Sequence, residues 1–480
     1  MFNIKLTKNK TFVFCFFVIY FFSFLILFSR EGLGLYFHPF SFDSFMDLFN
    51  MIASPVNSTY PPLSLIPFKL LHLIYPSITN SVELRNNYYG AFFLMIYILS
   101  FSTIFLYTIY FSIKGSSKRK VFYSVLFLFS GIVLWAIERA NVMTFAFLLS
   151  LLFVLFYTEN NEKKEKLSYV LIALAISLKL YPGAFLLLLL ERKDIKGIIS
   201  VILDVIIIFV FSFIVCRYLN FLINIEYSMD VNNYMASIGG YVIIMLHLAV
   251  ILFIALIGSF AIYVVYKQKW KCIKLIGIIS FFIFVVFTVF IDFVKDKNIF
   301  SSIANIFLPI INALNFGKKM TTFVEGVNVS LKNFILLFNY LLTGNSSISK
   351  TGIFILCKVL FIILCIFSFV FNTKCWKKLA SIALLCIYIP DFSGTYLLLY
   401  LLIPLLFFIN DTENDKIDYI YACLLAITTT FLIIPYKFNI KTYYLLTAPF
   451  VIISLCVFSL FLLLLGNALY DLIMRKNSNK

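Results

Sequence analysis

The sequence LSYVLIALAISLKLYPGAFLLLLL, at residues 167–190, decides how the chain is interpreted. Two apolar runs flank the segment KLYP at 179–182. Proline cannot continue a helix, and it disfavours helical geometry in the residue before it. Basic residues follow and precede the stretch, so both of its ends belong on one side of a membrane. The sequence therefore predicts a hairpin of two half-length helices with Lys179 and Pro182 at a buried tip, where irregular backbone indicates a cavity.

A second stretch repeats this pattern at residues 379–409, where PDFSG at 390–394 interrupts two apolar runs. Asp391 and Ser393 lie directly at this break. An ionisable residue within an apolar segment is expensive to place in a membrane and is a candidate for function. We therefore predict a second broken hairpin, with Asp391 and Ser393 beside a substrate cavity.

The composition is that of a membrane protein. The chain has 480 residues, of which 62% are hydrophobic and 13% are charged. Apolar runs of about 20 residues recur from end to end, which predicts an all-α, polytopic transmembrane helical bundle. We expect a single integral membrane domain over residues 1–480, with about 12 full or broken spans.

The charge and the cysteines exclude other classes of protein. The net charge of +17 comes from short basic clusters between apolar runs, which is typical of cytoplasmic loops and not of a nucleic-acid-binding surface. The nine cysteines show no disulfide or metal-binding spacing, and the three histidines are far apart. The sequence predicts no metal and no cofactor.

The basic clusters also predict the topology. Both termini and the basic loops are expected in the cytoplasm, in a cell (plasma or inner) membrane. The acidic loop at 410–416 gives a poor topology signal. Residues 29–87 form the first external loop, and residues 292–350 form a long external loop with interfacial helices at 299–314 and 331–342. Residues 241–291 resemble an insertion.

The first external loop carries the most distinctive polar residues. The sequence SFDSFMDLFNMIASPVNSTYPP at residues 41–62 contains Asp43 and Asp47, then Asn50 and Tyr60. The two acids are four residues apart and would share one face of a helix. They are either solvated acids of an interfacial helix or a general base that orients and deprotonates a hydroxyl.

Arg139 and Lys179 are cations in apolar surroundings. A cation within a span costs roughly 2.5–3.5 kcal/mol on insertion scales. Arg139 either forms an ion pair, for example with Glu138, or acts together with Lys179 as a clamp on a phosphate group. The chain lacks a glycine-rich phosphate loop, so the phosphate would not be that of a nucleotide held in the usual way.

Six short elements resemble family-87 glycosyltransferases, a membrane family of GT-C type, and they follow that family's order. They are MDLFN at 46–50, YPPLSLIPFKLL at 60–71, WAIERANV at 135–142, SLKLYPGAFLLLLLERKD at 177–194, GVNVSLKNFILL at 326–337 and YIPDFSGTYLLLYLLIP at 388–404. One departure is Ala140, which stands where the family element has glycine.

The resemblance implies a hexosyltransferase that uses a polyprenyl-phosphate sugar donor, often a mannosyl donor. It implies a glycan or glycolipid acceptor in the cell envelope, reached from the external face. The family's catalytic acid corresponds to Asp47, with Asp43 next in line, and its basic position corresponds to Lys179. The residues expected around the substrate cavity are Asn50, Tyr60, Glu138, Asn141, Tyr181, Asn328, Asp391 and Ser393.

Two other functions remain open from the sequence. An O-antigen-type polysaccharide polymerase also has many spans and a long external loop with basic residues. A lipid or glycan transporter, which is not an enzyme, also uses broken helices. A transporter would show internal repeats, and the two broken hairpins are the only hint of one. Convergence of Asp47, Arg139 and Lys179 would favour the transferase.

Overall fold

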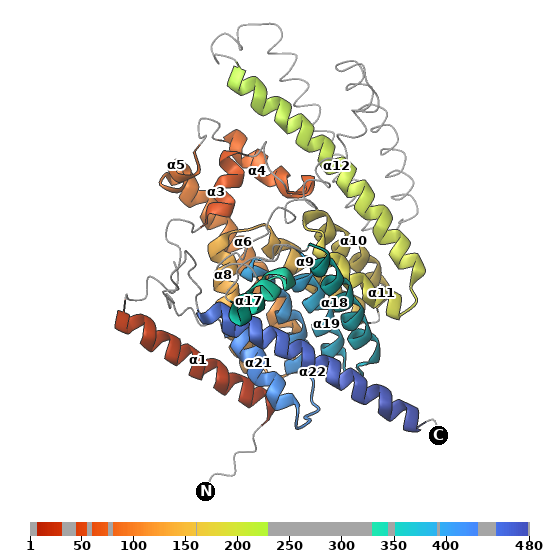
Figure 1. The fold of residues 1–480 in the computed structure, drawn as a ribbon. Coiled ribbons are helices and arrows are strands. Elements are labelled where there is room, and N and C mark those ends of the chain that lie inside the picture. The colour runs from red at the N-terminus through yellow and green to blue at the C-terminus, as the bar shows by residue number, and fades with distance from the viewer. Residues whose placement is uncertain are drawn as a thin grey trace. The chain divides into compact units, whose positions relative to one another are not determined.

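The computed structural model describes residues 7–30, 45–54, 60–74, 80–159, 161–228, 329–343, 351–390, 394–430 and 448–478. Every regular element within these ranges is a helix, as Figure 1 shows. The all-α prediction is therefore confirmed. Two compact units divide the chain: the first unit is Met1–Phe49, Arg85–Val201 and Leu314–Lys480, and the second unit is Asn50–Leu84 and Ile202–Ala313.

Most of the described helices belong to the first unit. In chain order they are α1 (Lys8–Arg30), α6 (Tyr88–Ser112), α7 (Ser117–Leu128), α8 (Gly131–Arg139), α9 (Met143–Thr158), α10 (Glu162–Leu178), η1 (Tyr181–Leu186), α11 (Leu187–Glu191), α17 (Leu331–Thr343), α18 (Thr351–Phe371), α19 (Cys375–Tyr388), η2 (Thr395–Leu401), α20 (Leu402–Asn410), α21 (Asp418–Thr430) and α22 (Ala448–Ser478).

The second unit contains α4 (Pro62–Ile74) and most of α5 (Ser81–Arg85) and α12 (Ile195–Ser228). The boundary between the units cuts α3 (Met46–Ala53) after Phe49. Within the second unit, the buried Lys69 of α4 donates a hydrogen bond to Asn220 of α12. The His72 imidazole lies 2.7 Å from the carbonyl oxygen of Ile52. These contacts satisfy polar side chains inside this unit.

Several described helices are long and apolar enough to cross a membrane. They cover Tyr88–Ser112, Ile195–Asn220, Gly352–Phe371 and Ile452–Met474, and α7 with α8 forms a fifth candidate that is bent by 51°. The protein is therefore a multi-pass membrane protein. Two of the apolar runs from which the sequence predicts spans, at residues 88–113 and 351–371, coincide closely with α6 and α18.

One predicted span differs in the structure. The sequence predicts one span at 121–137, and the chain forms this span as two helices, α7 and α8, with a 51° bend between them. The Ser130 hydroxyl donates a hydrogen bond to the carbonyl of Phe127, 2.7 Å away, and α8 starts at the next residue. A serine that binds nearby backbone in this way competes with helix continuation.

Both predicted broken hairpins are present. α10 ends at Leu178, and the chain turns back through the 3₁₀ helix η1, with Pro182 in its first turn, into α11. The second hairpin has the same plan, with α19 before the break and η2 and α20 after it. The hairpins contact each other, since the Cys386 thiol of α19 donates to the carbonyl of Tyr181 at 3.3 Å.

Aromatic side chains fill the space between these hairpins and α9. The rings of Phe147 and Phe185 each lie 5.9 Å from the ring of Tyr400, which is buried on η2. These large side chains fix the depth at which each hairpin reverses.

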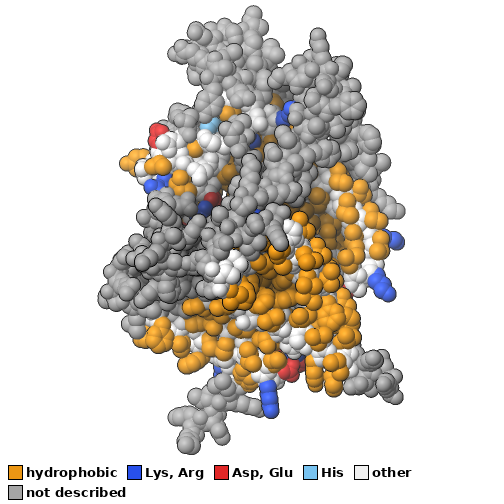
Figure 2. Space-filling view, in the orientation of Figure 1, with side chains coloured by type: hydrophobic (Ala, Val, Ile, Leu, Met, Phe, Trp, Pro, Cys, Tyr) orange, Lys and Arg blue, Asp and Glu red, His pale blue; other side chains and the backbone are white. Residues whose placement is uncertain are grey.

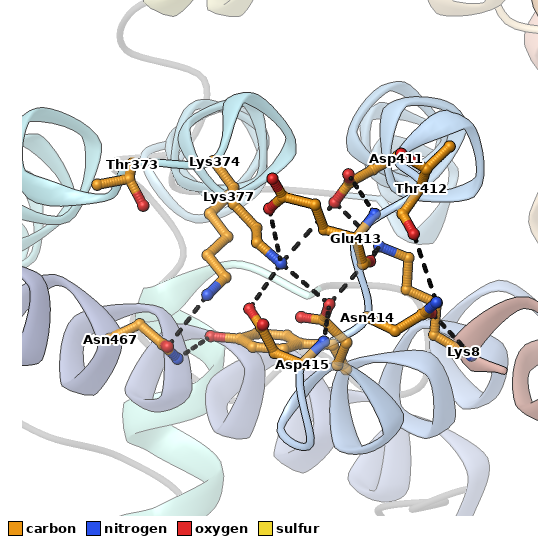
Figure 3. Close-up of polar contacts among 12 residues, drawn as sticks. Lys8, Thr373, Lys374, Lys377, Asp411, Thr412, Glu413, Asn414, Asp415 and Asn467 are labelled. Carbon is orange, nitrogen blue, oxygen red and sulfur yellow. Dashed lines mark hydrogen bonds and ion pairs between the residues drawn. The ribbon is translucent and has the colours of Figure 1, made fainter.

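Ion pairs connect the start of α1, the residue before α19 and the acidic segment that leads into α21, as Figure 3 shows. The Lys8 ammonium at the start of α1 lies 2.9 Å from Asp411 and 3.6 Å from Asp418. Lys374, before α19, lies 2.6 Å from Asp415 and 3.1 Å from Asp418. We call these five residues the Lys8 cluster. It neutralises the acidic loop that gave a poor topology signal.

Other loops gather at the same end of the first unit. Asn410 donates a hydrogen bond to the carbonyl of Ser112 at 2.8 Å, and Arg119 donates to the carbonyl of Ile409 at 2.8 Å. Lys378 forms an ion pair with Glu191. The loops that connect α6 to α7, α11 to α12 and α18 to α19 therefore meet near the start of α1. The sequence predicts these same basic loops to be cytoplasmic, and the side of the membrane stays a prediction.

The outer surface is strongly apolar. Figure 2 shows hydrophobic side chains over much of the described surface on the face in view. On α18, for example, Ile355 is 65% exposed and Leu356 is 69% exposed. An apolar surface of this extent is what a lipid-facing helix presents.

Candidate active site

Asp47 lies in the first turn of α3. A carboxylate in this position is stabilised by the helix dipole and by unpaired backbone N–H groups. The helix begins at Met46, after Phe45, which has a positive φ of 60° and whose N–H donates to the carbonyl of Glu138 at 2.7 Å. The backbone of α3 is therefore anchored to α8. Asp43 precedes this helix and lies outside the described residues.

Both oxygens of the Asp47 carboxylate are bound. Arg139 Nη2 lies 2.7 Å from Oδ1, and Arg139 Nε lies 3.4 Å from Oδ2. Asn141 Nδ2 donates to Oδ2 at 3.0 Å. Arg139 therefore does form an ion pair, and the partner carboxylate is Asp47, about ninety residues away in the chain. This two-point contact between guanidinium and carboxylate fixes the orientation of both groups.

Ala140, between Arg139 and Asn141, has a left-handed backbone conformation. The turn that it makes brings the side chains of Arg139 and Asn141 to Asp47. Ala140 caps α8 with φ of 48° and ψ of 42°. Side chains other than glycine pay about 1–2 kcal/mol in this conformation. The present chain adopts this conformation with alanine, at the position where the resembling element has glycine.

The amide of Asn141 has only one suitable orientation. Its Oδ1 accepts a hydrogen bond from the N–H of Met143 at 3.0 Å, at the start of α9. Its NH₂ group is therefore the half that faces Asp47. The Tyr97 hydroxyl lies 3.2 Å from the Asn141 carbonyl and 2.9 Å from the Thr144 hydroxyl, which ties this turn to α6. The turn that carries Arg139 and Asn141 is thus held by hydrogen bonds to α3, α6 and α9.

Two further side chains interact with this pair. The charge of Lys179, at the break of the first hairpin, interacts with that of Asp47. Tyr396, in the first turn of η2, interacts electrostatically with both Asp47 and Arg139. The tips of both broken hairpins therefore approach Asp47. We call Asp47, Arg139, Asn141, Lys179 and Tyr396 the Asp47 cluster.

The structure places the other predicted site residues differently. The Glu138 side chain is buried beside the pair, and its carbonyl holds Phe45. Tyr181 opens η1 and accepts a hydrogen bond through its carbonyl. Asn50 and Tyr60 belong to the second unit. Asn328, Asp391 and Ser393 lie outside the described residues, as do residues 241–291.

Sequence reasoning missed Tyr396 and Tyr97. Tyr396 lies within the YIPDFSGTYLLLYLLIP element, two residues after the glycine of the break, which is a signal that could have indicated it. Tyr97 is one tyrosine within a long apolar helix and carries no signal. In the part of the chain that the structure describes, no three His, Cys, Asp or Glu side chains are grouped to hold a metal ion.

The fold and these contacts define a multi-pass helical membrane protein with a partly buried, charged cluster at the tips of two broken hairpins. Residues 59–288 match the family model of glycosyltransferase family 87. This match confirms, over that part of the chain, the resemblance to family-87 glycosyltransferases seen in the short sequence elements. Comparison with curated proteins and with solved structures gave no match.

Proposed function

We propose that the protein transfers a hexose from a polyprenyl-phosphate donor to a glycan or glycolipid acceptor at the external face of the cell membrane. The observation that carries the proposal is the contact of Asp47 with Arg139, with Lys179 close enough to interact with the same carboxylate. An acid and two cations thus converge from sequence positions that are far apart. The family match supports a transferase over a polymerase or a transporter.

In this proposal Asp47 accepts the hydrogen bond of the attacking acceptor hydroxyl. As the new bond to the anomeric carbon forms, the bond from that carbon to the phosphate oxygen breaks, and the hydroxyl proton passes to Asp47. Arg139 and Asn141 hold the carboxylate in one orientation, which places the proton acceptor before the substrate arrives. The side chain of Asp47 is 19% exposed, so the carboxylate is accessible for such a contact.

Arg139 and Lys179 are proposed to bind the donor phosphate. The released polyprenyl phosphate carries the negative charge that develops as the bond breaks, and preorganised cations stabilise such charge. A guanidinium has five N–H donors and can hold a carboxylate and a phosphate at the same time. Lys179 supplies a second positive charge from the break of the first hairpin.

A lipid-linked donor suits this arrangement better than a nucleotide sugar. Its isoprenoid tail would lie along apolar helix surfaces of the kind seen on α18, while the phosphate reaches the cations. With a monophosphate clamped by two cations, the reaction needs no divalent metal. The resemblance to the family implies a donor sugar that is often mannose. The proposed acceptor for this protein is a component of the cell envelope.

The test is transfer by purified protein in liposomes. We expect product from a polyprenyl-phosphate hexose in the presence of EDTA. A requirement for a nucleotide sugar together with a divalent cation would contradict the proposed donor. The glycan profile of a deletion strain identifies the acceptor.

The external location is tested separately. A cysteine introduced at position 57, in the first loop, is expected to react with a membrane-impermeant thiol reagent from the external side. Labelling from the cytoplasmic side alone would overturn the orientation and leave the chemistry to be tested on the other face.

A further inference from the structure

Tyr396 is set apart from the other tyrosines of the second hairpin. Tyr388 and Tyr400 are buried in aromatic packing, at 1% and 0% exposure. Tyr396 is half-buried, and its side chain is within electrostatic range of Asp47 and Arg139. A tyrosine at the edge of a charged cluster can use its hydroxyl, which both donates and accepts hydrogen bonds.

Gly394 gives the Tyr396 ring its position. A Cβ atom added to Gly394 would lie 2.2 Å from Tyr396 Cε1 and 2.6 Å from Cζ. The ring therefore lies directly against the glycine backbone, and any larger residue would displace it. The backbone of Gly394 itself has φ of −58°, which other residues adopt readily. Space for the ring, and not backbone conformation, is the reason for a glycine here.

Neighbouring elements also fix the position of Tyr396. η2 packs against α8, the helix that ends in Arg139. Thr395 and Leu397, on either side of Tyr396, are both buried, so the backbone of η2 is held within the unit. The Tyr396 ring thus lies against a glycine on a fixed backbone, within electrostatic range of the Asp47 carboxylate that Arg139 and Asn141 hold.

We propose that Tyr396 is a positioning residue of the candidate active site, and that Gly394 provides the space that aims its phenol at the Asp47–Arg139 pair. This inference rests on the proposed function for its role in catalysis. In this proposal the Tyr396 phenol acts on the Asp47–Arg139 pair electrostatically and helps to keep Asp47 in the orientation that receives the acceptor proton. The second broken hairpin therefore contributes to the same site as the first.

Double-mutant cycles on turnover test the role. Tyr396→Phe removes only the hydroxyl, and we expect it to lower kcat about tenfold or more with little change in the KM for the donor. In the Asp47→Asn background the same substitution should have little further effect, because residues that act as one unit are not additive. Independent, additive effects would overturn the proposal.

Gly394 is tested in the same way. Gly394→Ala should lower kcat about as much as Tyr396→Phe does in the wild-type chain, and it should have little effect when Tyr396 is alanine. Tyr388→Phe is the matched control: its hydroxyl is buried and has no hydrogen-bond partner among the described residues, and kcat should stay near the wild-type value. Equal losses in Tyr388→Phe and Tyr396→Phe would contradict the assignment.

A stability cycle separates this inference from the proposed function. The thermal unfolding of wild type, Tyr396→Phe, Asp47→Asn and the double variant is measured in detergent without any substrate. A non-zero coupling supports the contact even if no sugar is transferred. Wild-type transfer without any coupling in stability or in kcat would remove Tyr396 from the site and leave the proposed function intact.

Discussion

The Asp47 cluster and the Lys8 cluster both pair acids with bases inside the first unit, but they are built in different ways. Lys8 is 1% exposed and Asp418 is 0% exposed, and Lys374 lies within 4 Å of Asp411, Glu413, Asp415 and Asp418. In the Asp47 cluster the acid and the arginine are 19% and 14% exposed. The Lys8 cluster joins chain segments, whereas the Asp47 cluster keeps a carboxylate accessible.

The difference also lies in the backbone that carries each cluster. Two acids of the Lys8 cluster, Asp411 and Asp415, sit in the loop between α20 and α21, and Asp418 begins α21. Lys8 reaches Asp411 across about four hundred residues of sequence. The residues of the Asp47 cluster stand at helix ends and breaks, next to the left-handed Ala140 and Phe45. Unusual backbone conformations concentrate where side chains must be aimed at a substrate. The comparison predicts that substitutions in the Asp47 cluster change turnover and that substitutions in the Lys8 cluster change stability.

Asp47→Asn is expected to give the largest effect. Loss of the proton acceptor should lower kcat by about 10²–10⁴-fold, while the fold and donor binding persist. Turnover of a polyprenyl-phosphate hexose in liposomes and donor binding by the same preparation are the measurements. Asp471→Asn, at the other end of the unit, is the control with near-normal turnover. Near-normal turnover in Asp47→Asn would move the base elsewhere, with Asp43 next in line.

Lys8→Met is expected to change stability and not catalysis. It leaves Asp411 and the buried Asp418 without one of their cations, and breaking a buried ion pair costs about 3–5 kcal/mol. Thermal unfolding in detergent should show a lower Tm, while kcat per folded molecule stays unchanged. Lys10→Met, on the same turn of α1, serves as control. A lost kcat with a normal Tm would contradict the structural role.

The Lys8 cluster also predicts a pH dependence of stability. Burial raises the pKa of Asp411, but the hydrogen bond and charge of Lys8 outweigh it and the net pKa is below the ordinary 3.8. The hydrogen bond with Lys374 lowers the pKa of Asp415. Burial lowers the pKa of Lys374, but hydrogen bonds to Asp415 and Asp418 outweigh it and the net pKa is above the ordinary 10.5.

The directions of these pKa shifts decide whether stability is lost as pH falls or as pH rises. The carboxylates contribute stability that is fully present above their ordinary pKa and is lost as pH falls through the lowered pKa of the folded state. Lys374 contributes stability that is present below 10.5 and is lost as pH rises through its raised pKa. Tm measured against pH should fall less steeply in acid for Asp415→Asn than for wild type. Glu162→Gln, in an ion pair whose acid is 80% exposed and screened by solvent, should change the acid limb less than Asp415→Asn does. Equal slopes in all three proteins would contradict the prediction.

Ala140→Gly should give the smallest effect of these variants, and the effect should be a gain in stability. Glycine adopts the left-handed conformation of this residue without strain, which should stabilise the folded protein by up to about 1 kcal/mol. A slightly higher Tm with unchanged kcat is the expected result. Ala136→Gly, within α8, is the matched control and should lower Tm, because glycine weakens a helix interior. A lower Tm in Ala140→Gly would contradict the cost assigned to the alanine.

Part of the fold could be predicted because its signals are local. The apolar runs of α6 and α18 and the proline breaks at the start of η1 and before η2 depend on neighbouring residues alone. Charged residues within apolar segments likewise marked Arg139 and Lys179. The bend between α7 and α8 was missed because a serine in an apolar run has no strong sequence signal, and its effect depends on the hydrogen bond that it makes.

By itself the sequence determined the class of protein, the broken hairpins and the identities of an acid and two cations of the candidate site. Only the tertiary structure decided which groups meet: Asp47 with Arg139 and Asn141, Tyr396 with the Asp47–Arg139 pair, and Lys8 with the acidic loop. Hydropathy and helix breaks act over a few residues, so they can be read along the chain. Ion pairs and ring contacts join residues tens to hundreds of positions apart, and only the packing of the helices brings them together.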